Sequence, residues 1–149
     1  MRRIVIGYDG SERGEDALAL GRAFARLADE PHVIVATVYP ALIPRTAHGE
    51  PSAREQRLRD DAERLLERAR ERWPELPASA FRAVRGSSPA AGLHRLVREE
   101  ELDLIVVGSS HRHGLGRIWH GSATEQTLHG SPRPVAVAPP GYAADQGAE

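Results

Sequence analysis

Short runs of consecutive apolar residues alternate along this chain with longer stretches in which apolar residues recur every three or four positions. The clear runs are at residues 3–8, 33–39, 104–107 and 135–138, and a weaker run interrupted by arginines is at 78–85. Unbroken apolar runs are typical of strands that are covered on both faces of a sheet. Because these runs alternate with helical stretches, the pattern predicts an α/β fold with a parallel sheet and helices on both faces.

Helix start signals support this division. Ser11 precedes the first helical stretch, Ser52 and Glu55 form a capping box before the second, and Ser88–Pro89 opens the third. Serine at these positions accepts a hydrogen bond from a free backbone N–H group of the first turn, and proline is tolerated at the first helical position. A fourth helix is predicted over residues 122–128. The weaker run at 78–85 favours an edge strand.

The predicted order β-α-β-α-β-α-β-α-β places two strand ends together. If the third strand lies at an edge, the first and fourth strands flank the point where the strand order reverses. Open parallel sheets bind ligands in the crevice at that point, beyond the carboxyl ends of the strands. Asp9 follows the first strand and Gly108 ends the fourth. We therefore expect Asp9 and Gly108 to meet at one crevice.

The stretch over residues 102–126 carries the strongest functional signal. Its strand ends at Gly108, a twelve-residue connection follows, and Gly121–Ser122 then opens a helix. A strand, a glycine-bearing loop and a helix start present backbone N–H groups and the positive end of a helix dipole to an anion. We predict a phosphate-binding corner here, with Arg112 as the arginine best placed to contact phosphate.

The same residues have structural explanations that the sequence leaves open. Ser122 and Glu125 form a capping box, which accounts for the serine without a ligand. Asp9 can brace the turn before the first helix, and Gly108 can serve the backbone geometry whatever binds.

Composition narrows the function classes. The chain has 149 residues, which predicts one domain, and its 20 basic residues, all arginine, balance 21 acidic ones. This balance argues against nucleic-acid or membrane-surface binding, and no apolar stretch approaches the roughly 20 residues of a membrane span. The absence of lysine and cysteine excludes a Walker-type lysine and a thiolate nucleophile. We expect a cytoplasmic protein.

Metal and catalytic sites are weakly indicated. His111, His113 and His120 lie close together in sequence and could hold a transition metal, but no carboxylate is near them. The chain has no G-x-S-x-G motif and no carboxylate pair at a strand end beside a base. The sequence therefore predicts neither a metal site nor a catalytic residue.

Several segments together resemble the universal stress protein family. They are IVIGYDGS at 4–11, Gly86-x-x-Pro89, DLIVVGSSHR at 103–112, GSATEQ at 121–126 and RPVAVA at 133–138. The resemblance implies an adenine nucleotide alpha hydrolase-like fold, with a single five-stranded parallel sheet in the order 3-2-1-4-5. It covers nearly the whole chain, so we expect one domain over residues 1–139 and a disordered tail over 140–149.

The resemblance also implies a ligand. ATP-binding members carry glycine, two residues, glycine, nine residues, and glycine followed by serine or threonine. Gly108 and Gly121–Ser122 match this pattern, whereas the middle glycine is His111. The implied contacts are those of Asp9 and Val38 with adenine and ribose, and of Val107 and Gly108 with ribose and the first phosphate. Gly121, Ser122 and Ala123 would hold the distal phosphates, with Mg²⁺ as counter-ion. Gly7 and Arg112 complete the set of predicted binding residues.

The function implied is that of a stress-response regulator or sensor that binds ATP, or ADP or AMP, and forms a homodimer through the last strand, Val135–Ala138. Two alternatives stay open. Because of His111, the chain could be a nucleotide-free protein of the same fold that acts through protein–protein interaction. It could also be a slow ATP hydrolase, with at most weak activity.

Overall fold

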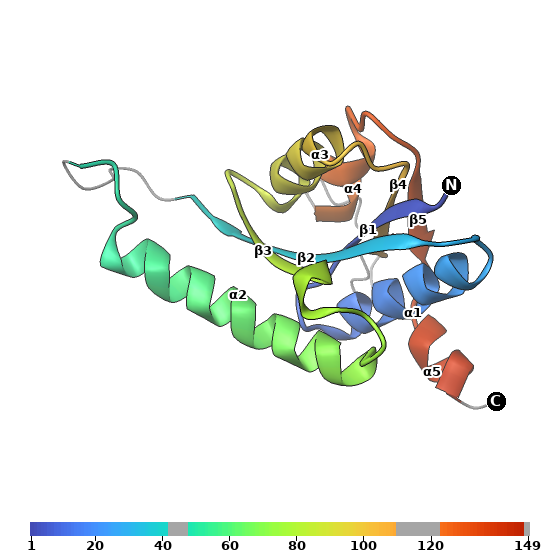
Figure 1. The fold of residues 1–149 in the computed structure, drawn as a ribbon. Helices are drawn as coiled ribbons and strands as arrows, with labels where there is room; N and C mark the ends of the chain where they lie inside the picture. Colours follow the sequence, from blue (N-terminus) through green and yellow to red (C-terminus); the bar gives the residue numbers. More distant parts are fainter. Residues whose placement is uncertain (42–47, 110–122, 148–149) are drawn as a thin grey trace, which may run out of the picture.

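A five-stranded parallel sheet in the order β3-β2-β1-β4-β5 forms the centre of the fold (Figure 1). This computed structural model describes residues 1–41, 48–109 and 123–147. It confirms the predicted sheet, its strand order and the edge position of the third strand. The strands are β1 (Arg3–Gly7), β2 (His32–Pro40), β3 (Phe81–Gly86), β4 (Leu104–Gly108) and β5 (Val135–Ala138).

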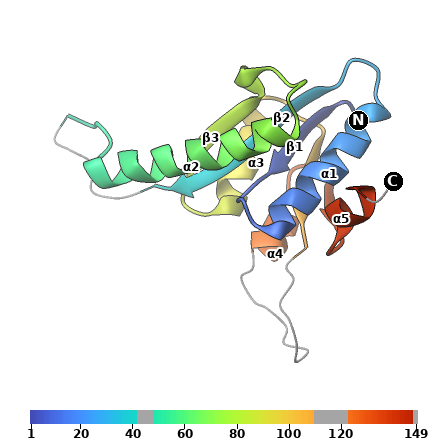
Figure 2. The same cartoon turned by 90° about the horizontal axis from the view of Figure 1, so that it is seen from below.

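Helices cover both faces of this sheet, as predicted. In Figures 1 and 2, α1 and α2 lie on one face and α3 and α4 on the other, while α5 lies beside α1. None of the helices in the described ranges has the length and apolar composition of a membrane span. The helical segments are α1 (Glu12–Arg26), α2 (Ala53–Arg72), the short 3₁₀ segment η1 (Ala78–Ala80), α3 (Pro89–Glu99), α4 (Ala123–Leu128) and α5 (Tyr142–Gly147).

Two cores result because successive side chains of a strand point to opposite faces. Along β1, Ile4 and Ile6 belong to the core under α1 and α2, whereas Val5 belongs to the core under α3. All three side chains are fully buried. The continuous apolar runs in the sequence are therefore explained by burial of the central strands on both sides.

The predicted serine caps are present in the first three helices. The side chain of Ser11 accepts from Gly14 N, that of Ser52 from Glu55 N, and that of Ser88 from Ala91 N, at 3.3, 3.2 and 3.0 Å. These bonds fix where each helix begins. They therefore also fix the short loops that join the carboxyl ends of β1 and β3 to the helices that follow.

The end of the chain differs from the expectation of a disordered tail, because Tyr142–Gly147 forms α5. The carboxylate of Asp16 in α1, 4% exposed, accepts hydrogen bonds from Gly141 N at 3.1 Å and Ala143 N at 2.8 Å. A carboxylate bound to the first N–H groups of a helix stabilises that helix. The tail was not recognisable as helical because its capping residue lies 125 positions earlier in the sequence.

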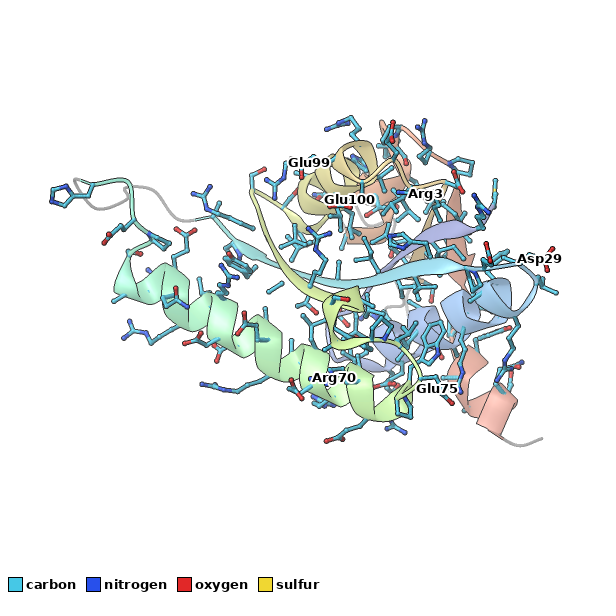
Figure 3. The ribbon with its side chains drawn as sticks, viewed as in Figure 1. Arg3, Asp29, Arg70, Glu75, Glu99 and Glu100 are labelled. Carbon is cyan, nitrogen blue, oxygen red and sulfur yellow. The ribbon has the colours of Figure 1, made fainter. Side chains whose placement is uncertain are left out.

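At the amino ends of the strands, Asp103 ties β1 to β4. Its Oδ2 accepts from the backbone N–H groups of Arg2 at 3.2 Å and Arg3 at 3.0 Å. The guanidinium of Arg3 donates to the carbonyl oxygens of Glu100 and Glu101, and Figure 3 shows Arg3 beside Glu100. The hydrogen bond from Arg3 N–H lowers the pKa of the Asp103 carboxyl below its ordinary value.

This lowered pKa gives a pH-dependent contribution to stability. A carboxyl with a lower pKa in the folded state stabilises the fold above its unfolded pKa, near 3.9, and loses that contribution as the pH falls through the folded value. We expect Asp103→Asn to reduce the free energy of unfolding at pH 7 by about 1 kcal/mol, with a smaller difference at pH 3. Urea unfolding at both pH values measures this, with Asp29→Asn in the exposed α1–β2 turn as control (Figure 3). An equal difference at both pH values would contradict the assignment.

Candidate functional site

A cavity of about 230 Å³ lies at the carboxyl ends of β1, β2 and β4, where the strand order reverses. Residues from the loop after β1, the first turn of α1 and the helices α2, α3 and α4 complete its walls. The lining residues are Gly7, Tyr8, Asp9, Arg13, Gly14, Ala36, Thr37, Val38, Leu65, Pro89, Leu93, Val107, Gly108, Ala123, Thr124 and Thr127.

Many residues singled out from the sequence meet at this cavity. Asp9 and Gly108 line it together, as expected from the order of the strands. The remaining predicted residues among its walls are Gly7, Val38, Val107 and Ala123. Arg112, Gly121 and Ser122 lie outside the described residues, as does His111. Contact of any of these residues with a ligand stays a prediction.

The end of β1 leaves an open edge of β2 facing the cavity. Tyr8 N donates to Ala36 O at 2.9 Å, and in a continuous parallel ladder the next bond would run from Val38 N to Tyr8 O. Instead, the hydroxyl of Thr37 donates to Tyr8 O at 2.7 Å. The peptide groups of Val38 point the same way as those of Ala36, because alternate residues of a strand share a direction. Val38 therefore presents a neighbouring donor and acceptor to the cavity that it lines.

Threonine hydroxyls also close the opposite wall, and the sequence analysis missed them. Thr124 Oγ1 donates to Gly108 O and Thr127 Oγ1 donates to Ala123 O, both at 2.6 Å. The first of these bonds ties α4 to the end of β4. Thr127 bonds to the carbonyl four residues earlier in its own helix, whereas the partner of Thr124, Gly108 O, lies 16 positions earlier and no local motif marks it.

Two opposite charges stand at the rim. Asp9 is exposed, and its Oδ1 accepts from Ser11 N at 3.0 Å and from Ser11 Oγ at 2.5 Å. The aspartate thus braces the turn, which was the structural explanation left open by the sequence, while it also lines the cavity. Arg13 is exposed at the same rim and offers a cation.

Two glycines let α1 approach the strand ends. A Cβ at Gly108 would lie 2.3 Å from Arg13 O, and a Cβ at Gly14 would lie 2.7 Å from Asp9 Oδ1. Neither distance is compatible with a side chain unless the backbone or the carboxylate moves. Backbone packing alone therefore accounts for Gly108, independently of any ligand.

Tyr8 forms part of the wall as a neutral group. Its ring is buried, and its hydroxyl donates to Glu15 Oε1 at 2.7 Å. Burial, followed by this hydrogen bond, raises the pKa of Tyr8 far above its ordinary value. The hydroxyl therefore keeps its proton throughout the physiological pH range and orients Glu15.

Within residues 1–41, 48–109 and 123–147, no group of three or more histidine, aspartate or glutamate side chains is arranged to hold a metal ion. The histidines considered for a transition metal, His111, His113 and His120, lie outside these ranges.

The sheet order and the cavity at its reversal point define an open, doubly wound α/β domain of the ligand-binding type. The family model "Universal stress protein family" matches residues 1–139, and the chain belongs to this family. A universal stress protein of Mycobacterium tuberculosis is 29% identical over 143 residues, which cover 93% of this chain and 49% of that protein. The corresponding protein of Mycobacterium bovis matches equally. This chain thus spans about half the length of these curated relatives.

Solved structures show the same fold. A universal stress protein in complex with cAMP is 25% identical, with a TM-score of 0.68 over 91% of this chain and 94% of that chain. The universal stress protein of Archaeoglobus fulgidus in complex with dAMP is 19% identical, with a TM-score of 0.58 over 93% of this chain and 98% of that chain. At 19% identity the likeness shows the fold alone.

The close approach at Gly108 predicts a purely structural effect of substitution. Gly108→Ala should lower the free energy of unfolding by about 1–3 kcal/mol, because the new Cβ meets a backbone carbonyl that cannot rotate away. Urea unfolding without added ligand measures this. Gly147→Ala is the control, since no atom lies within 4 Å of its Cβ position. Equal stability of the two variants would contradict the proposed packing.

Proposed function

We propose that this protein binds an adenine nucleotide (ATP, or ADP or AMP) in the cavity between β1 and β4, and that it acts as a nucleotide-responsive regulator or sensor in a stress response. The observation that carries the proposal is the open edge of β2 at Val38, where a donor and an acceptor face an apolar cavity. An adenine ring presents a matching acceptor and donor along one edge. Relatives of this fold crystallised with cAMP and dAMP support the choice of adenine nucleotides.

The size of the cavity favours the nucleoside part of such a ligand. Pockets for drug-sized molecules measure about 300–1,000 Å³, and this cavity measures about 230 Å³. Adenine would lie between the side chains of Val38, Pro89 and Leu93, with the ribose beside Gly7, Asp9 and Val107, all of which line the cavity.

The phosphates would then extend past Gly108 towards Ala123, with Gly121, Ser122 and Arg112 as their proposed partners. Arg13 at the rim is a further cation for them. Mg²⁺ would accompany a di- or triphosphate as counter-ion, held by the phosphate oxygens and water, as is usual for this ion.

We assign binding and signalling rather than efficient catalysis. The described polar groups of the cavity are peptide groups, threonine hydroxyls that donate to carbonyl oxygens, and the two rim charges. Asp9 already uses one carboxylate oxygen to brace the turn at Ser11. Such groups recognise and orient a nucleotide. A cytoplasmic location, where adenine nucleotides are abundant, is part of the proposal.

The proposal includes a homodimer paired through β5. Ile105 N donates to Pro134 O and Ser109 N donates to Ala138 O, each at 3.0 Å, so the peptide groups of these even-numbered residues face β4. Those of Val137 therefore face the open edge of the sheet, and this residue is 37% exposed. An open apolar edge strand is stabilised by pairing with another strand.

Calorimetric titration of the protein with Mg·ATP, ADP and AMP tests the nucleotide site. We expect a dissociation constant below about 1 mM for at least one of them, equivalent to about −4 kcal/mol or better. Ala123→Leu, which places a larger side chain at an exposed position of the cavity wall, should weaken binding at least tenfold. Ala53→Leu, exposed at the start of α2 and outside the cavity, should bind like the unaltered protein. Affinity weaker than 1 mM for all three nucleotides, or equal affinity of both variants, rejects the proposal.

Analytical ultracentrifugation tests the dimer. Val137→Pro removes the N–H group that faces the open edge and leaves the bonds to β4 in place, a position where strands tolerate proline. We expect this variant to sediment as a monomer at concentrations where the unaltered protein is dimeric. Val137→Thr keeps the N–H group and the β-branch and should remain dimeric. A dimer that survives Val137→Pro would show that β5 is not the interface.

A further inference from the structure

A second cavity, of about 350 Å³, lies along α1 between the end of α2 and α5. Figure 2 shows α5 beside α1, on the same side of the sheet as α2. We call this cavity the α1–α5 groove. It shares no lining residue with the cavity between β1 and β4. Its charged lining residues are Glu15, Arg22, Arg26 and Arg72.

Arg22 is held in a fixed position at the groove. Its guanidinium lies over the ring of Trp73, 5.7 Å from the ring centroid. It donates to Arg72 O at 3.2 Å and pairs with Glu75 Oε1 at 3.3 Å. The cation is therefore ordered before any ligand arrives, so little side-chain entropy is lost on binding.

The other two arginines keep donors for a ligand. Arg72 Nε lies 3.7 Å from Glu15 Oε2, which is longer than a hydrogen bond, and its side chain is 69% exposed. Arg26 is exposed one helical turn after Arg22. Like charges four residues apart on a helix repel by a few tenths of a kcal/mol, and a bound anion would relieve this repulsion.

The third wall of the groove is α5, which contributes Ala143, Gln146 and Gly147. The bonds from Gly141 N and Ala143 N to the buried carboxylate of Asp16 hold this helix on α1. Helices α1 and α5 are thus fixed to one another at the groove, and Gln146 adds a neutral amide donor to its lining.

We propose that the α1–α5 groove is a second ligand site, which binds a compact polyanion carrying two or more phosphate groups. Three guanidinium groups and one carboxylate line the groove, and Glu75 beside it pairs with Arg22, so one positive charge remains in excess. Guanidinium forms paired hydrogen bonds with phosphate oxygens, and several such groups around one cavity match more than one phosphate. A volume of about 350 Å³ suits a small molecule and not a folded partner.

The test uses inorganic pyrophosphate as the probe and calorimetric titration of the full chain at 0.15 M salt, since screening removes weak surface attraction. We expect a dissociation constant below about 1 mM. Arg26→Gln and Arg72→Gln should each weaken binding at least fivefold. Arg64→Gln is the control, because Arg64 pairs with Asp61 on an exposed part of α2 that does not line the groove. Equal thermal unfolding midpoints of the variants would show that the fold is retained.

The Ala123→Leu variant separates this site from the nucleotide cavity. Pyrophosphate binding that persists in Ala123→Leu and falls in both groove variants supports the second site, whether or not nucleotide binds between β1 and β4. Binding that is lost in Ala123→Leu and unchanged in Arg26→Gln and Arg72→Gln would assign the probe to the nucleotide cavity. That result, or no binding below about 1 mM, overturns the proposal.

Discussion

The close approach of the first turn of α1 to the ends of β1 and β4 is the constraint on which the rest of the molecule depends. It requires glycine at position 108, where a Cβ would lie 2.3 Å from Arg13 O, and at position 14, against Asp9. The rim of the first cavity follows from it, since Asp9, Arg13, Gly14 and Gly108 all line that cavity. Gly108 would thus be required with or without a ligand, so this residue type alone says little about binding.

What a ligand would recognise comes from a different feature, the interrupted ladder between β1 and β2. A threonine hydroxyl takes the place of a backbone donor at Tyr8 O, and the chain after β1 turns away at Asp9. An open strand edge is ordinarily exposed at the side of a sheet, where water satisfies it. Here the open edge of β2 lies inside the protein at Val38, and a bound heterocycle would form hydrogen bonds with its free backbone groups. The proposed selectivity for adenine therefore rests on backbone groups.

The sequence predicted the features that depend on local periodicity. Burial of β1 on both faces, the caps at Ser11 and Ser88, and the crevice between Asp9 and Gly108 all follow from neighbours in the chain or from general rules of parallel sheets. It did not predict α5, whose cap is Asp16, because nothing in residues 140–149 encodes a partner in α1. The hydroxyl of Thr37 was missed for the same reason: its partner, Tyr8 O, becomes a neighbour only when β2 pairs with β1. The predicted phosphate contacts at Arg112, Gly121 and Ser122 fall outside the described residues.

Three consecutive residues in the first two turns of α1 perform separate tasks because a helix turns by about 100° per residue. Gly14 admits the carboxylate of Asp9, Glu15 accepts from Tyr8 and lies near Arg72, and Asp16 holds α5. Tyr8 lines the first cavity, whereas Glu15 and Arg72 line the groove, so the hydrogen bond from the Tyr8 hydroxyl to the Glu15 carboxylate joins the two. Burial raises the pKa of Tyr8, so its hydroxyl stays protonated and remains the donor in this bond. Helix α1 consequently contributes to the walls of both the first cavity and the α1–α5 groove.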